Sequence, residues 1–133
     1  MVLKLSSVRA DISAEEAGQW IDYAPWPGVS FHVRSTNSQS FVTARLVALR
    51  KLAEKHNGAD ETIPPEEMAA AVGALLAEHL LIGWQGVDVP YTPEAALEHL
   101  TDVGHRDLRN AVEWCGAQVA KIVPAFEENQ AKN

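Results

Sequence analysis

The sequence predicts a mainly α protein, a single small domain in which four to five helices pack around a central apolar helix, with an N-terminal β-hairpin. The chain has 133 residues, of which 47% are hydrophobic and 22% charged, so one domain can bury a core of its own. After residue 38 the apolar residues recur at helical spacing. Before it they alternate around prolines and a glycine, which is typical of a hairpin. We place the globular domain at residues 1–123 and a flexible C-terminal tail at residues 124–133.

The hairpin is predicted at about residues 19–34, after a very short helix capped near Ser13. Its two alternating runs flank the sequence Pro25-Trp26-Pro27-Gly28, which favours a turn. In the second run, Val29, Phe31 and Val33 would face the core. The intervening residues would face solvent: Ser30, His32 and Arg34.

Two long helices are predicted next, at about residues 38–56 and 64–82. The first gathers its large apolar side chains on one face: Phe41, Val42, Leu46, Leu49, Leu52 and Ala53. The second opens with Pro64-Pro65, and proline is favoured in the first turn of a helix. It is apolar around most of its circumference, which is typical of a helix at the centre of a fold.

Two shorter segments complete the predicted domain after a loop at residues 83–90. A helix at about residues 92–101 has Thr92 as its N-cap and Pro93 at its first position. The last helix, at about residues 105–123, carries a narrow apolar stripe that would pack against the core on one side. Its members are Leu108, Ala111, Val112, Cys115, Val119 and Ile122.

The formal net charge of -7 is unevenly distributed along the chain. Residues 1–60 hold seven Lys and Arg against six Asp and Glu, whereas residues 61–133 hold four against twelve. This acidity argues against a nucleic-acid partner, which would require a clustered basic face. It could attract a basic partner or simply keep the protein soluble. Cys115 is the single cysteine, so we expect no intramolecular disulfide and a cytosolic protein without a membrane segment.

No motif in the sequence predicts catalysis. The five histidines have no spacing typical of zinc ligands, and Cys115 lies on the predicted buried stripe. The glycines after the central helix match no phosphate-binding or dinucleotide-binding pattern. We therefore expect a protein that is not an enzyme and that binds neither a metal nor a cofactor.

Five residues are better suited to contacts with a partner: Trp26, Trp84, Trp114, Arg45 and Tyr91. Exposed aromatic and arginine side chains are favoured as interface anchors. Two of the tryptophans also have a structural interpretation, because Trp84 could cover the core and Trp114 could pack on the hairpin. Arg45 could extend along an apolar face to solvent or pair with a carboxylate.

Two stretches of the chain resemble the tail assembly chaperones of long-tailed, siphovirus-type bacteriophages. The first is the apolar helix that ends in Glu78-His79-Leu80-Leu81-Ile82-Gly83-Trp84-Gln85-Gly86-Val87, followed by Pro90-Tyr91-Thr92-Pro93-Glu94-Ala95-Ala96-Leu97. The second is Gly28-Val29-Ser30-Phe31-His32-Val33-Arg34, which is similar to the N-terminal strand of that family. Together with the helix between them, they span most of residues 20–123.

The resemblance implies a non-enzymatic protein of the infected bacterial cytoplasm that is not part of the finished virion. Such chaperones bind and solubilise the tape measure protein and help to recruit tail tube subunits. The resemblance also implies a longer form of the chain made by ribosomal frameshifting, and self-association into a homo-oligomer stays open. Two alternatives remain: a structural head-tail connector or tail terminator protein, and a small helical regulatory protein.

Overall fold

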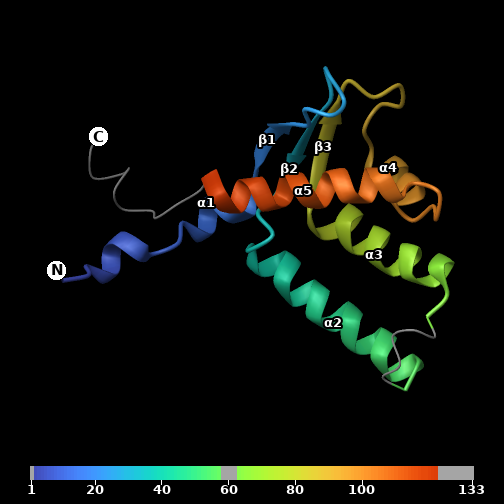
Figure 1. Ribbon diagram of the computed structural model, residues 1–133, viewed down its shortest axis with the longest axis horizontal. Helices are drawn as coiled ribbons and strands as arrows, with labels where there is room; N and C mark the ends of the chain where they lie inside the picture. Colours follow the sequence, from blue (N-terminus) through green and yellow to red (C-terminus); the bar gives the residue numbers. More distant parts are fainter. Residues whose placement is uncertain (1, 58–62, 123–133) are drawn as a thin grey trace.

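The computed structural model describes residues 2–57 and 63–122. A short 3-10 helix, Leu5–Val8, precedes five α-helices and three β-strands (Figure 1). In chain order these are α1 (Ile12–Ala17), β1 (Gln19–Asp22), β2 (Ser30–Val33), α2 (Gln39–Lys55), α3 (Pro65–His79), β3 (Leu81–Gln85), α4 (Pro93–Leu100) and α5 (Arg106–Ile122). The mainly helical prediction is confirmed, whereas the predicted tail at residues 124–133 lies outside the described residues.

The three strands form one antiparallel sheet in the order β1-β2-β3. The predicted hairpin is therefore present as β1 and β2, but β3 extends it. We expected residues 81 and 82 to end a helix and residues 83–90 to form a loop. That prediction was wrong for residues 81–85, which form β3, whereas residues 86–90 do lie in a loop. A short apolar run such as Leu81–Trp84 does not reveal from its periodicity whether it is helical or extended. Pairing with β2 decides the matter, because Phe31 lies opposite Trp84 and His32 opposite Gly83.

The core lies between the inner face of the sheet and the helices. Its largest fully buried side chains are Phe31, Val33, Leu76, Leu80, Leu100, Val112, Cys115 and Val119. Figure 1 shows α5 between the sheet and the two long helices α2 and α3. Helix α3 packs against α2, α4, α5 and β3, while α5 packs against α3, α4, β1 and β2. The centre of the fold is thus shared by two helices, and not formed by α3 alone as expected.

Ser30 was expected to face solvent, but its side chain is buried. It lies at the start of β2, directly opposite Gln85 at the end of β3. Its hydroxyl group donates a hydrogen bond of 3.4 Å to Gln85 Oε1. The third strand therefore explains the error, because a two-stranded hairpin would have left this residue at an open edge.

A network around Glu16 fixes the start of α2. Both carboxylate oxygens accept hydrogen bonds from Ser40, one from its backbone N–H at 2.9 Å and one from its hydroxyl group at 3.0 Å. Arg34 donates to the backbone oxygens of Glu16 and His79, at 3.0 Å and 3.3 Å. The Ser40 backbone N–H, the Ser40 hydroxyl group and Arg34 together lower the pKa of the Glu16 carboxyl. Ser38, the N-cap residue of α2, makes no capping hydrogen bond with its side chain. Glu16 of α1 therefore caps the start of α2 in its place.

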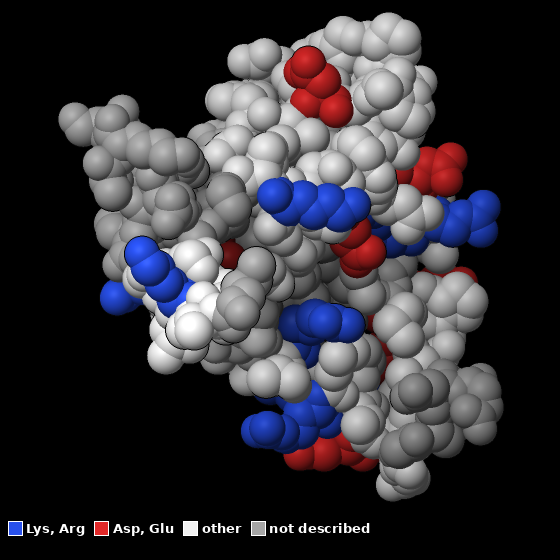
Figure 2. All heavy atoms as spheres, turned by 60° about the vertical axis from the view of Figure 1, so that its left-hand side comes forward, with Lys and Arg blue, Asp and Glu red and all other residues white. Residues whose placement is uncertain are grey.

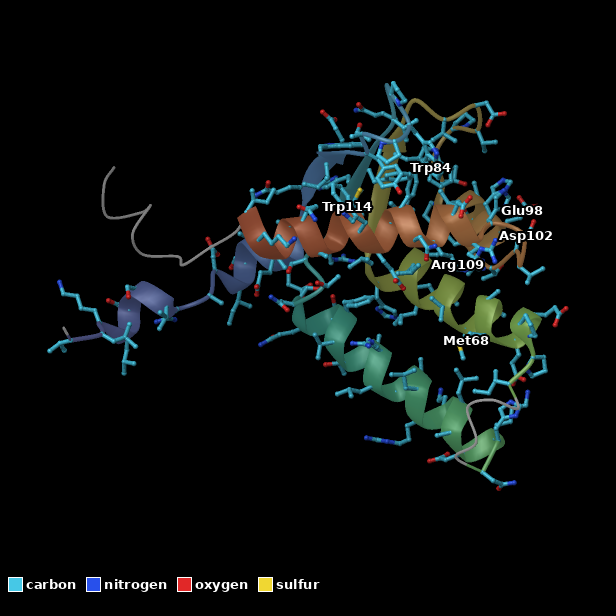
Figure 3. The ribbon with its side chains drawn as sticks, viewed as in Figure 1. Met68, Trp84, Glu98, Asp102, Arg109 and Trp114 are labelled. Carbon is cyan, nitrogen blue, oxygen red and sulfur yellow. The ribbon has the colours of Figure 1, made fainter. Side chains whose placement is uncertain are left out.

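The connection between α4 and α5 is held by Arg109. Its guanidinium group donates to the backbone oxygens of Leu100, Asp102 and Val103, at 3.0, 2.6 and 3.3 Å. Figure 3 shows Arg109 on α5 directed toward Asp102. These bonds satisfy carbonyl groups at the end of α4 that have no partner within the helix.

Candidate partner-binding surface

Helix α2 leaves most of its apolar surface uncovered. Only Phe41 and Leu52 are buried on this helix, which packs mainly against α3 and α1. Four other large side chains are 41% to 58% exposed: Val42, Leu46, Val47 and Leu49. The sequence predicted that the apolar residues of this helix gather on one face over residues 41–53. Of that face, Phe41 and Leu52 are buried, whereas Val42, Leu46 and Leu49 are covered by no element among the described residues.

A groove of about 700 Å³ runs between α2 and α3. Half of its lining residues are alanine, valine or leucine: Ala44, Val47 and Ala48 from α2, and Ala71, Ala74 and Leu75 from α3. Polar side chains line it as well: Gln39, Ser40, Thr43 and His79. Lys51 and Glu78 are its charged lining residues, one from each helix. Small side chains allow another helix to approach the two backbones closely, so the groove has the character of a helix-binding surface.

Polar contacts hold both ends of α2. The start of α2 is capped by Glu16 as described above. Near its end, Glu67 of α3 accepts from Lys55 Nζ at 2.7 Å and lies 2.8 Å from His56 Nε2. The hydrogen bond from Lys55, together with His56, lowers the pKa of the Glu67 carboxyl. The start of α2 is therefore held by α1 and its end by α3.

Trp26 and Trp114 both contact the ring of Tyr23. Tyr23 makes edge-to-face contacts with both, with centroid distances of 5.0 Å to Trp26 and 5.6 Å to Trp114. Trp114 nevertheless stays 45% exposed. It projects from α5, and Tyr23 follows β1, so the structural alternative in which Trp114 packs on the hairpin is confirmed (Figure 3).

Trp84 and Tyr91 form a second aromatic pair. Their rings are perpendicular, with centroids 5.3 Å apart. Trp84 is only 7% exposed, because it lies on β3 and its Nε1–H donates to the backbone oxygen of Val89 at 2.7 Å. Tyr91 donates to the backbone oxygen of Leu81, and burial raises the pKa of its hydroxyl group. Trp84 therefore covers the core and orders the segment after β3, and it presents little surface to a partner.

Arg45 lies apart from these aromatic residues, on α2. It is exposed, and its charge opposes the rise that desolvation causes in the pKa of Glu113 on α5. Among the predicted contact residues, Arg45 is thus the one on the uncovered helix, whereas Trp26, Trp84, Trp114 and Tyr91 cluster around the sheet.

One exposed aromatic residue was missed by the sequence reasoning. Trp20 stacks on His32 across the outer face of the sheet, with ring centroids 5.1 Å apart, and its ring extends over Gly83. The alternation of the hairpin residues could have placed Trp20 and His32 on the same face. Gly83 could not be added to them, because it was assigned to a loop.

The described residues contain no group of three His, Cys, Asp or Glu side chains that could hold a metal ion. In the same part of the chain, no helix combines the length and apolar character that crossing a bilayer requires. Figure 2 views the side on which the N-terminal segment comes forward, and there Lys and Arg side chains are interspersed with acidic ones.

A family model described as YdaY prophage protein matches residues 36–133. The matched region includes α2, α3 and the groove between them, and it excludes β1 and β2. No curated protein and no solved structure matches the chain.

Proposed function

The chain belongs to the YdaY prophage protein family, and we propose that it is a non-enzymatic tail assembly chaperone. In this proposal it acts in the cytoplasm of the bacterial host and binds a helical segment of the tape measure protein. It keeps that client soluble, helps to recruit tail tube subunits and leaves before the virion is complete. A prophage family supports a role in a phage, and the finer assignment follows from the resemblance and from the surface of α2.

The residues that carry the resemblance have structural roles that explain their presence. Gly86 directly follows β3 with a φ of 79°, and a Cβ there would collide with the backbone oxygen of Gly28. Thr92 accepts from the Ala95 N–H at 2.9 Å as the N-cap of α4, and Pro93 is its first residue. These residues determine how the chain turns and where α4 begins, and they supply no reactive group. They therefore support a shared fold and not a shared reaction.

The uncovered apolar surface of α2 is the observation that carries the proposal. Complete burial of an aliphatic side chain contributes about 1.5–3 kcal/mol, and four such side chains on α2 are only about half covered. An amphipathic client helix that covers them would gain a few kcal/mol before the costs of association are subtracted. A contact of this size is reversible, as a chaperone that must release its client requires.

The charges around this surface suggest the chemistry of the client. Arg45, Arg50 and Lys51 flank the exposed apolar residues of α2. We therefore expect a client helix that has acidic residues beside its apolar face, because opposite charges orient two partners as they approach.

Co-expression with the neighbouring tape measure protein tests the proposal. The wild-type chain should raise the soluble fraction of that protein, and the double variant Leu46→Asp, Leu49→Asp should lose this effect. Val103→Asp is the matched control, because Val103 is as exposed as Leu49 but follows α4. Circular dichroism checks that each variant folds. An unchanged soluble fraction with the wild-type chain, or equal effects of both variants, would contradict the proposal.

Purified virions provide an independent test. A chaperone should be undetectable in them by mass spectrometry, although it is abundant in the infected cell. Stoichiometric presence in the particle would instead identify a structural protein such as a connector or terminator.

A further inference from the structure

The segment before α1 is apolar and exposed. Val2, Leu3, Leu5 and Val8 are 62% to 90% exposed, and none of the residues in Leu5–Val8 is buried. The hydrogen bonds of this segment are local, for example from the Ser7 hydroxyl group to the Lys4 oxygen at 2.7 Å. We call residues 2–9 the arm; Figure 1 shows that it projects from the body of the protein.

The arm is also basic. Lys4 and Arg9 are its charged residues, and it contains no acidic residue. A partner of the arm therefore needs an apolar recess with acidic residues at its edge.

One pocket has this chemistry. Apolar residues such as Trp26, Phe31, Trp84 and Leu108 line a cavity of about 640 Å³. The exposed Asp88 and Asp107 line it too, together with His99 and His105. No Lys or Arg is among the described residues that line it. We call it the aromatic pocket.

The groove between α2 and α3 fits the arm less well. It is lined by one cation and one anion, Lys51 and Glu78, and Arg45, Arg50 and Lys55 belong to the same helix as Lys51. The excess of positive charge on that helix has the same sign as Lys4 and Arg9, so it disfavours the arm, whereas the two aspartates of the aromatic pocket attract it.

The arm and the aromatic pocket are two different surfaces of the molecule. Figure 1 places the arm at one end of the long axis, and Figure 3 shows Trp84, which lines the pocket, within the body of the protein. A contact between two different surfaces joins copies head to tail in rings or open filaments, or closes a twofold dimer when two copies exchange their arms reciprocally.

We propose that the arm of one copy docks in the aromatic pocket of a second copy. Leu3 and Leu5 supply the apolar anchors, and Lys4 and Arg9 pair with Asp88 and Asp107. This contact is separate from the exposed apolar face of α2 formed by Val42, Leu46, Val47 and Leu49, which we call the client surface. It does not depend on the proposed function.

Two complementary variants test this proposal with the purified full chain and no client. The arm variant carries Leu3→Ser and Leu5→Ser. The pocket variant carries Asp88→Lys and Asp107→Asn, two changes at exposed side chains that leave the apolar residues of the pocket intact. Light scattering after size exclusion should show concentration-dependent assembly of the wild-type chain and monomers for each variant alone.

Mixing the two variants gives the sharpest result. The arm variant keeps an intact pocket and the pocket variant keeps an intact arm, so together they should form a 1:1 dimer that grows no further. Leu46→Ser, on the client surface, is the control and should assemble like the wild-type chain. The proposal is overturned if the wild-type chain stays monomeric, if either variant assembles normally or if the mixture contains no dimer.

Discussion

Gly73, in the middle of α3, lies directly against the backbone carbonyl group of Leu100, where α4 ends. A Cβ atom at Gly73 would collide with the Leu100 oxygen and with the backbone of Thr101. The absence of a side chain at this residue therefore allows α3 and α4 to pack as closely as they do.

Gly73→Ala should destabilise the protein although alanine is the better helix former. The gain in helix propensity is about 1 kcal/mol, whereas overpacking against a rigid backbone costs about 1–3 kcal/mol or more. We expect a net loss measurable by urea denaturation. Gly104→Ala is the control, since its nearest neighbour is a side-chain oxygen of Asp102 at 3.3 Å. Equal stabilities of the two variants would contradict the close packing of α3 on α4.

Glu16→Gln should weaken the acid dependence of stability. The folded-state pKa of Glu16 is lowered from 4.5, mainly by the backbone N–H of Ser40. The unfolded state therefore binds the proton more readily, so the stabilisation is present above about pH 4.5 and is lost as the pH falls through the folded pKa. At neutral pH the loss of this cap should cost about 1 kcal/mol.

Ser40→Ala is the informative companion to that variant. It removes the hydroxyl donor but keeps the backbone N–H, so most of the acid dependence should remain. Urea denaturation of both variants, repeated at about every pH unit from about pH 3 to about pH 7, measures how the free energy of unfolding depends on pH. An acid dependence in Glu16→Gln equal to that of the wild-type chain would show that Glu16 does not cap α2.

The Cys115 thiol should be unreactive in the native protein. Burial in the core raises its pKa from 9.0 to about 11, so little thiolate forms at pH 8. A disulfide reagent such as dithionitrobenzoate should modify it only as fast as the protein unfolds, and rapidly in denaturant. Fast stoichiometric labelling of the native protein would contradict the buried stripe of α5.

Trp84→Ala should cost much more stability than Trp114→Ala. Truncation of a buried tryptophan costs about 3–5 kcal/mol, and Trp84 also loses its hydrogen bond to Val89. Trp114 is half exposed, and its loss removes chiefly the edge-to-face contact with Tyr23, about 0.5–1.5 kcal/mol. Thermal unfolding of both variants measures the difference. Equal losses would contradict the burial of Trp84 on β3.

The elements with local signals were predicted well from the sequence. Thr92 and Pro93 start α4 as expected, and α5 buries most of its predicted stripe. Capping and helical periodicity depend on neighbours within a few residues, so the sequence contains them directly. Two members of the stripe differ: Leu108 is partly buried, and Ile122 lies half exposed at the end of the described helix.

The elements that depend on distant partners were not predicted. Leu81–Gln85 becomes a strand because β2, about 50 residues earlier, offers an edge for pairing. For the same reason the burial of Trp84 was only one of two interpretations. On α2 the apolar pattern named Leu46 and Leu49, but periodicity does not say whether another element covers them. The candidate site is therefore the part of the apolar face of α2 that stays exposed among the described residues.

A photo-crosslinking amino acid at residue 46 tests the central claim most directly. In cells that assemble tails, we expect ultraviolet light to join the chain to the tape measure protein through the exposed face of α2. The same amino acid at residue 103 is the control and should give far less of that product. If residue 46 crosslinks to no phage protein, or no more than residue 103 does, α2 is not the client surface and the proposed function loses its main support.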